Sequence, residues 1–266
     1  MEHRLPLSKD QMPEAGSDEY NQMQKTPFRE LLGSLLYLAG VTRGDIAAPV
    51  NKLSRYSSNP GTIHWKALKR ILIYLYHTRE RKLTFGSNKA RYKPSELKKN
   101  ELYPLQAYVD ADHAGCQDTA RSTSGVIITL FGGTVLCKSK RQGKVSNSTG
   151  MAELHAVAEM TRKSDHYRQV LLDICGYHQK VFPIFTDSNV VIKMLERGNL
   201  SNQTKHLRIS YHEVKENVES GLVSLSHIAG TENPSDICTK TLPRVSHEKH
   251  TNFILQDQVQ FLGDVD

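Results

Sequence analysis

The spacing of apolar residues changes its period near residue 104, and this change limits the folds open to the chain. Between residues 26 and 78 apolar residues recur at helical spacing. We expect one helix after the Thr26-Pro27 pair, a second capped by Asp45 and a third over 62–78. From residue 105 apolar and polar residues alternate, which is typical of strands. The sequence therefore predicts a helical segment followed by a sheet-containing domain.

The second part of the chain predicts an α/β fold. Five segments read as strands: 105–111, 125–131, 134–139, 181–186 and 222–228. Gly132-Gly133 predicts a tight hairpin between the second and third strands. Helices are expected over 149–175, from Ser188, over 205–220 and over 234–241. This order predicts a mixed five-stranded sheet flanked by helices, with an antiparallel first half.

Composition divides the chain into five segments. Residues 1–25 are polar, with scattered proline and glycine, and are expected to be poorly ordered. The helical region covers 26–86, a basic linker 87–103, the α/β domain 104–243 and a C-terminal tail 244–266. On the third helix we expect Trp65, Leu68, Leu72 and Leu75 to form the apolar face.

The charge of the 266-residue chain favours a polyanionic partner. Its formal net charge is +7 and its pI is about 9.1, and Lys and Arg side chains that neutralise phosphates release counterions on binding. The four cysteines lack zinc-ligand spacing and are expected to be reduced, mostly buried thiols. No long apolar run and no secretion signal is present, so we expect a soluble intracellular protein with no membrane partner.

Four acidic residues stand at the ends of strands or the beginnings of helices. Asp110 and Asp187 end apolar strands, Glu153 lies in the first turns of the long helix, and Asp236 opens the last one. Each alone has a simpler explanation, such as a solvated residue or a charge favoured by a helix dipole. In the expected topology all four meet at one edge of the sheet, where they would repel one another without bridging cations. Two Mg²⁺ ions, or Mn²⁺, are the expected cofactors, and metal-assisted phosphodiester hydrolysis is the expected chemistry.

The order Asp110, Glu153, Asp187, Asp236 resembles the Asp-Glu-Asp-Asp set of the ribonuclease H family. Other motifs resemble copia-type retrotransposon Pol polyproteins: Tyr108-Val-Asp-Ala-Asp-His-Ala-Gly115, Arg121-Ser-Thr-Ser-Gly125, Thr204-Lys-His-Leu-Arg208, Tyr211-His212 and Asp236-Ile-Cys-Thr-Lys240. The likeness continues upstream through 27–37, 51–56 and 64–71, which are similar to the segment that follows the polymerase palm.

This resemblance implies a ribonuclease H-like domain preceded by a thumb-like and connecting region of a reverse transcriptase. It implies cleavage of the RNA strand of RNA–DNA hybrids, with the hybrid and other Pol products as partners, and with the four acids holding two Mg²⁺ ions. Lys205, His206 and Arg208 at a helix start are expected to contact nucleic acid. Ser122, Thr123 and Ser124 are the second candidate contact, to phosphate or the RNA 2′-hydroxyl. The expected location is the cytoplasm, within virus-like particles, with the nucleus as an alternative.

A second hypothesis is a nucleic-acid-binding relic of a retrotransposon with weak or lost hydrolysis. Four positions depart from the copia pattern: His113 for Trp, Gly150-Met151 for Thr-Glu, Leu154 for Tyr and Ser235 for Ala. Other readings rank lower. The Asp-Ser/Thr-Gly motif of an aspartic protease is absent, the acids are out of order for an integrase, and an Ala separates Asp110 from Asp112, unlike the paired acids of a polymerase palm.

Overall fold

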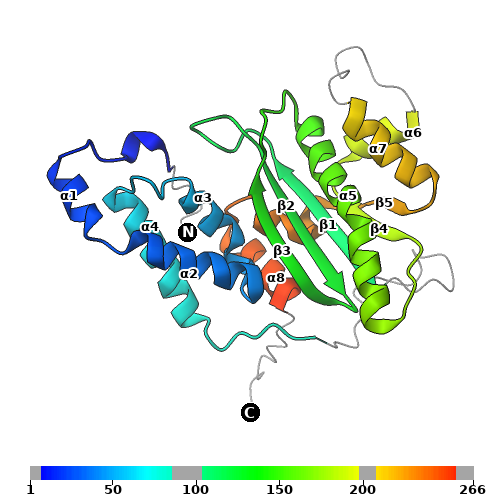
Figure 1. Cartoon of the computed structure of the whole chain (residues 1–266), viewed down its shortest axis with the longest axis horizontal. Coiled ribbons are helices and arrows are strands. Elements are labelled where there is room, and N and C mark those ends of the chain that lie inside the picture. Colours follow the sequence, from blue (N-terminus) through cyan, green and yellow to red (C-terminus); the bar gives the residue numbers. More distant parts are fainter. Residues whose placement is uncertain (1–6, 86–103, 198–207, 256–266) are drawn as a thin grey trace.

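The computed structural model describes residues 7–85, 104–197 and 208–255, and its centre is one mixed sheet (Figure 1). The strands are β1 (Leu105–Asp112), β2 (Thr123–Leu130), β3 (Gly133–Arg141), β4 (Phe182–Thr186) and β5 (Val223–His227). They are ordered β3-β2-β1-β4-β5; β2 is antiparallel to β1 and β3, whereas β4 is parallel to β1 and β5. The predicted ribonuclease H-like mixed sheet of five strands is confirmed.

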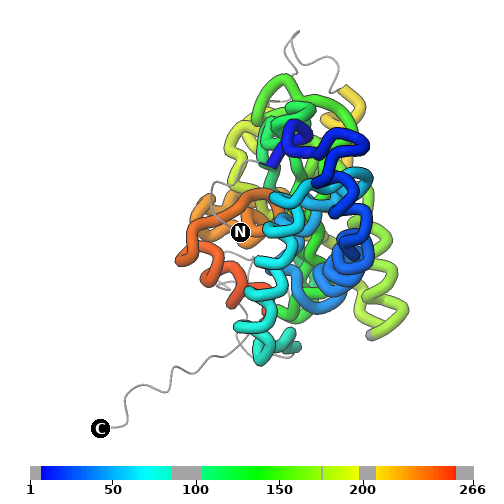
Figure 2. Tube along the Cα trace, turned by 90° about the vertical axis from the view of Figure 1, so that its left-hand side faces the viewer, coloured from blue at the N-terminus to red at the C-terminus, as the bar shows by residue number. Residues whose placement is uncertain are grey.

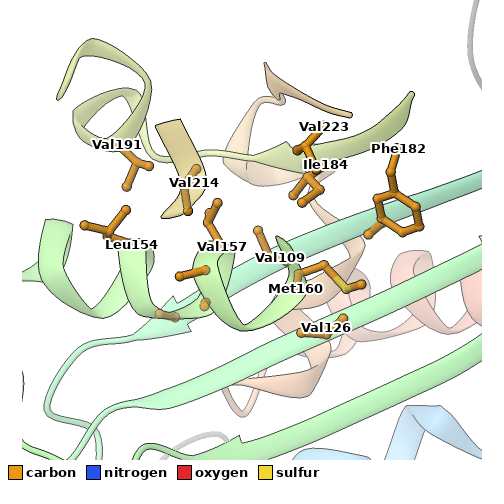
Figure 3. Packing of buried hydrophobic residues seen from close by; sticks show 14 of the residues in the cluster. Val109, Val126, Leu154, Val157, Met160, Phe182, Ile184, Val191, Val214 and Val223 are labelled. Carbon is orange, nitrogen blue, oxygen red and sulfur yellow. The ribbon is translucent and has the colours of Figure 1, made fainter. Parts of the chain in front are cut away.

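Alternate residues of β1 face two different cores, as a strand with a period of two requires. Val109 belongs to the core on the face covered by three helices. These helices are α5 (Thr149–Cys175), α6 (Asn189–Arg197) and α7 (Arg208–Glu219). Figure 3 shows Leu154, Val157 and Met160 of α5 in the same core as Val109 and Val126 of the sheet. Burial of these side chains fixes α5, and with it Glu153, against the sheet.

The opposite face of the sheet is covered by the C-terminal end of the described chain. Its elements are η5 (Gly230–Glu232), η6 (Pro234–Cys238) and α8 (Arg244–Leu255). Tyr108 of β1 stacks on Phe185 and meets Phe253 of α8 edge-on, each at 5.2 Å between ring centroids. Ile254 and Leu255 are buried in the same core. The part of the expected C-terminal tail over 244–255 is therefore a helix that covers the sheet.

A separate helical core precedes the sheet. Its elements are η1 (Lys9–Gln11), α1 (Asp18–Gln24), α2 (Phe28–Val41), η2 (Gly44–Ile46), α3 (Ala47–Ser54) and α4 (Thr62–His77). This region packs on the domain, and its contacts include the following two. Asn51 of α3 donates from Nδ2 to the carbonyl of Ser139 in β3 at 3.0 Å. Tyr74 of α4 meets His247 of α8 edge-on at 5.5 Å, and Figure 2 shows these two helices side by side.

Residues 7–25 differ from the expectation of poor order. They include η1 and α1, and Leu7 and Met23 are almost fully buried. Tyr56 donates its hydroxyl to the Leu7 carbonyl at 2.7 Å, and Glu19 accepts from the Thr62 backbone N–H at 2.7 Å. The segment has no apolar period of its own, but tertiary contacts with later helices order it. Its composition therefore led to a wrong expectation.

The expected helix cap at Asp45 is also wrong. Asp45 lies inside η2 and is completely buried, where it forms a 2.7 Å ion pair with Arg43 and accepts from the Tyr74 hydroxyl. On α4 the buried residues are His64, Ala67, Leu68 and Ile71, so the apolar face is turned from the expected one. Tyr56 stacks on His64 with ring centroids 4.3 Å apart, so this histidine is part of the buried face of α4.

Three of the four cysteines, Cys116, Cys137 and Cys238, are buried free thiols, as expected. The expected basic linker over 87–103 lies outside the described residues. In the described part of the chain no helix combines the length and apolarity needed to span a bilayer.

Candidate active site

Asp110 lies on β1 and is 1% exposed. It follows Tyr108 by two residues, so its side chain is on the face covered by η6 and α8. The Thr239 hydroxyl donates to Asp110 Oδ2, and Lys240 Nζ lies 3.3 Å from the same oxygen. Asp110 is therefore held by the residues that follow η6.

Asp236 is brought to Asp110 by the local structure of η6. The Asn233 side chain caps this short helix by accepting from the Ser235 backbone N–H at 3.2 Å, and it donates to the Val109 carbonyl at 3.0 Å. Pro234 supplies the fixed φ that suits the first turn. Close approach of η6 to β2 requires Gly125, because a Cβ there would lie 2.7 Å from the Ser235 carbonyl oxygen.

Asp187 follows the last residue of β4, the parallel neighbour of β1. Carboxylate oxygens of Asp110, Asp187 and Asp236 all lie within 4.8 Å of one another. Asp187 Oδ1 is buried and has no hydrogen-bond partner in the described part of the chain. The close neighbour Gly230 leaves the space that the Asp187 carboxylate occupies, since a Cβ there would lie 3.1 Å from Oδ2.

Glu153 reaches the site from the opposite face of the sheet. It lies near the start of α5, whose N-cap Ser148 accepts from the Met151 backbone N–H at 3.3 Å. Glu153 Oε1 accepts from the Ala111 N–H at 3.3 Å, and Oε2 is buried without a partner among the described residues. The site therefore straddles the end of β1, with three aspartates together and the glutamate beside Ala111.

The electrostatics of the site favour a bound cation. Burial, and then the charges of Asp110 and Asp187, raise the pKa of Glu153 to about 9. Burial and the Asp110 charge raise the pKa of Asp236 to about 6, and the same two causes raise the pKa of Asp187. A positive charge placed among these groups would favour their ionised forms.

Lys240 is the site residue that the sequence analysis did not single out. Its Nζ lies 2.9 Å from Asp236 Oδ1 as well as 3.3 Å from Asp110 Oδ2. Burial alone lowers the pKa of Lys240, but the two carboxylates outweigh burial and raise it. The signal was its position four residues after Asp236 in the last motif, which places both on one side of a helical turn.

The donor set fits a hard divalent cation. All four side chains offer carboxylate oxygens, which Mg²⁺ and Mn²⁺ prefer, and two of those oxygens are buried without a hydrogen-bond donor in the described structure. Asp110, Asp187 and Asp236 would hold such an ion between them, with Glu153 as the added ligand at the edge of β1.

The expected nucleic-acid contacts lie in different environments. Ser122 and Ser124 are buried and accept from the Ala114 N–H and the Gln142 side-chain amide. Thr123 accepts from Arg55 at 3.1 Å. Arg208 is exposed at the start of α7, while Lys205 and His206 lie outside the described residues. Their roles in binding nucleic acid stay predictions.

The departures from the copia pattern are accommodated locally. His113 Nε2 lies 3.0 Å from the Ser146 carbonyl oxygen, and Ser235 donates its hydroxyl to Asn233 at 2.6 Å. Leu154 is fully buried in the core beneath α5. Gly150 lies where a Cβ would be 2.7 Å from a Val190 methyl carbon, so α5 and α6 approach each other closely here.

The chain is similar in sequence to retrotransposon Pol polyproteins and to a secreted effector protein. No family model matches the chain. Over 244 residues it is 34% identical to the Retrovirus-related Pol polyprotein from transposon TNT 1-94 of Nicotiana tabacum, covering 92% of this chain and 17% of that protein. A stretch of 142 residues is 38% identical to Secreted RxLR effector protein 161 of Plasmopara viticola, covering 53% of this chain and 92% of that protein. A solved structure of LC11-RNase H1 isolated from compost is also similar, with 17% identity and a TM-score of 0.41. The match covers 52% of this chain and 94% of the chain of that protein.

The strand order and the cluster of Asp110, Asp187 and Asp236 agree with the ribonuclease H-like fold predicted from the sequence. The sequence similarity goes further than the fold. Over about 90% of its length the chain is similar, at 31–34% identity, to Pol polyproteins of copia-type retrotransposons. It spans less than a fifth of the length of the tobacco polyprotein, 17% of it.

Proposed function

We propose that this chain is the ribonuclease H part of a retrotransposon Pol polyprotein, a metal-dependent endonuclease that cuts the RNA strand of RNA–DNA hybrids. The observation that carries the proposal is that carboxylate oxygens of Asp110, Asp187 and Asp236 lie within 4.8 Å of one another. Glu153 accepts a hydrogen bond from the backbone N–H of Ala111, the residue after Asp110. Sequence similarity to retrotransposon Pol polyproteins supports a nuclease role within a polyprotein. The hybrid substrate and its RNA strand follow from the ribonuclease H resemblance.

The residues of the site have different roles in the proposed hydrolysis. Divalent ions bound by the four acids would activate a water molecule and stabilise the leaving oxygen of the phosphodiester. Thr239 and the backbone of η6 keep Asp110 and Asp236 facing each other. Lys240 supplies a positive charge at the same place, where it offsets the repulsion of the acids and attracts a phosphate. Asp187 and Glu153 retain carboxylate oxygens without protein partners in the described chain, and these oxygens are available as ligands.

The test is cleavage of a hybrid whose RNA strand carries an end label. We expect the purified chain to cut the RNA in Mg²⁺ or Mn²⁺, not in EDTA, and to leave duplex DNA intact. Asp110→Asn should abolish cleavage. Asp165→Asn is the matched control, because Asp165 lies on α5 with 90% of its side chain exposed.

Two results would contradict the proposal. Cleavage that persists at the wild-type rate in Asp110→Asn would place the activity elsewhere. Wild-type chain that binds the hybrid without cutting it in either metal would favour the second hypothesis, a nucleic-acid-binding relic.

A further inference from the structure

A cavity of about 230 Å³ lies between the helical region and the sheet, beside the acidic site. Lys52 of α3 and Arg55, the C-cap of this helix, line one side of it, and Asp112, Thr123 and Ser139 of the sheet line the other. Thr239 and Lys240, which hold Asp110, complete the wall. The cavity thus shares two residues with the environment of the proposed metal site, although four of its eleven lining residues, Ala48, Pro49, Lys52 and Arg55, come from the helical region.

Hydrogen-bonding groups in this cavity are incompletely used. Arg55 donates from one terminal nitrogen to Thr123 Oγ1 at 3.1 Å, but its Nε is buried and has no partner in the described part of the chain. The Ser139 hydroxyl is likewise buried without a partner among the described residues. Leaving such groups unpaired costs free energy, so a buried guanidinium nitrogen without an acceptor is a position where an anionic ligand would be bound favourably.

The charge of the cavity is not balanced. Lys52 and Arg55 line the same cavity, and burial, followed by the charge of Arg55, lowers the pKa of Lys52. Asp112 is the opposing carboxylate, and it lies against Gly115, where an added Cβ would be 1.8 Å from its Oδ2. Lys240 is already paired with Asp110 and Asp236. Among the described residues that line this cavity, Asp112 is therefore the carboxylate left to balance Lys52 and Arg55.

The basic pair is held rigidly against the sheet. Val50, Leu53 and Tyr56, which flank the two cations on the chain, are fully buried in the helical core. Asn51 fixes α3 to the Ser139 carbonyl. This anchoring means that Lys52 and Arg55 have a fixed position relative to the acids, as a subsite for a polymeric substrate requires.

We infer that this cavity binds a backbone phosphate of the nucleic acid that enters the acidic site, with Lys52 and Arg55 of the helical region as its cationic ligands. Ser139 and Arg55 Nε supply the hydrogen bonds. The inference rests on the proposed function for the identity of the ligand. It adds that the helical region completes the substrate site, so that the ribonuclease H-like domain is not the whole binding surface.

The experiment measures the affinity of the full chain for an RNA–DNA hybrid in EDTA, where nothing is cut, over a series of salt concentrations. Each phosphate that the protein neutralises contributes about 0.9 to the slope of log K against log salt. We expect Lys52→Ala/Arg55→Ala to bind more weakly, with a slope smaller by about 0.9. Lys66→Ala is the matched control, because Lys66 is an exposed residue of α4 in the same region and should leave the slope unchanged.

Thermal unfolding of each variant shows whether it folds. If loss of the Arg55–Thr123 hydrogen bond unfolds the double variant, Lys52→Ala alone carries the test and should reduce both affinity and slope. A folded variant with the wild-type slope would overturn the inference. Its failure is distinguishable from failure of the proposed function: a chain that cuts hybrids but shows no dependence on Lys52 lacks the subsite. A chain that binds through Lys52 but never cuts has the subsite without the nuclease.

Discussion

Replacing Gly125 with alanine would test how η6 holds the acidic site together. Gly125 is opposite Asp110 in the register of β1 and β2. An added Cβ would lie 2.6 Å from Thr239 Cγ2, 2.7 Å from the Ser235 carbonyl oxygen and 2.9 Å from Cys238 Cβ. Carbon atoms in contact normally lie about 3.5–4.0 Å apart. Two of the three atoms are a carbonyl oxygen and a Cβ, which cannot move away by rotating a side chain, so η6 itself must shift.

The expected size of the effect follows from this overlap. Forcing one extra carbon into a packed interior costs about 1–3 kcal/mol, so the free energy of unfolding should fall by roughly 2 kcal/mol. Relief of the overlap requires a movement of about 1 Å, and an error of that size in a catalytic group can cost about 100-fold in rate. Because η6 carries Asp236, we expect hybrid cleavage by Gly125→Ala to fall by about that factor.

Urea unfolding gives the stability, and the labelled-hybrid assay gives the rate. Gly33→Ala is the control, since Gly33 is exposed on α2 and an added Cβ would meet nothing within 4 Å. That variant should be as active as the wild type and more stable by about 0.5–1 kcal/mol. The reasoning is refuted if Gly125→Ala unfolds at the wild-type urea concentration and cuts at the wild-type rate.

Further expectations concern the charges of the site. Without metal, the free energy of unfolding should fall as pH rises from about 5 to about 9, because folded Glu153 keeps a proton that the unfolded chain loses near pKa 4.5. Urea unfolding in EDTA measures this, and a Glu153→Gln profile as steep as the wild type would contradict it. Lys240→Ala should lose about 1–2 kcal/mol in EDTA and regain it in Mg²⁺, since the ion replaces the lost charge beside Asp110. Lys249→Ala, at an exposed pair with Glu232, should change stability by less than about 0.5 kcal/mol; equal losses in both variants would argue against a special role for Lys240.

Much of the sheet and the acidic set could be predicted from the sequence because both depend on local patterns. Alternation of apolar residues identified β1, and an acid near the end of such a strand identified Asp110. Asp187 followed in the same way from β4, and the parallel pairing of the two strands brings their ends together. The turn between β2 and β3 was displaced by one residue: Phe131 and Gly132 have positive φ, and Gly133 begins β3.

The remaining features depend on contacts between distant segments. The burial of Leu7 and the pairing of Asp45 with Arg43 need neighbours from other helices, which local spacing does not reveal. The cavity at Lys52 exists only because α3 packs on β3. Lys240 could have been found from its spacing to Asp236, but its contact with Asp110 joins residues 130 positions apart.

Binding of Mn²⁺ in the absence of nucleic acid shows directly whether the acidic residues form a metal site. Free Mn²⁺ has a paramagnetic resonance signal that disappears on binding, so a titration gives the amount bound. We expect the wild-type chain to bind Mn²⁺, Asp110→Asn and Asp236→Asn to lose this binding, and Asp165→Asn to retain it. Equal binding by the wild type and both site variants, or none by the wild type, would contradict a metal site built from these acids.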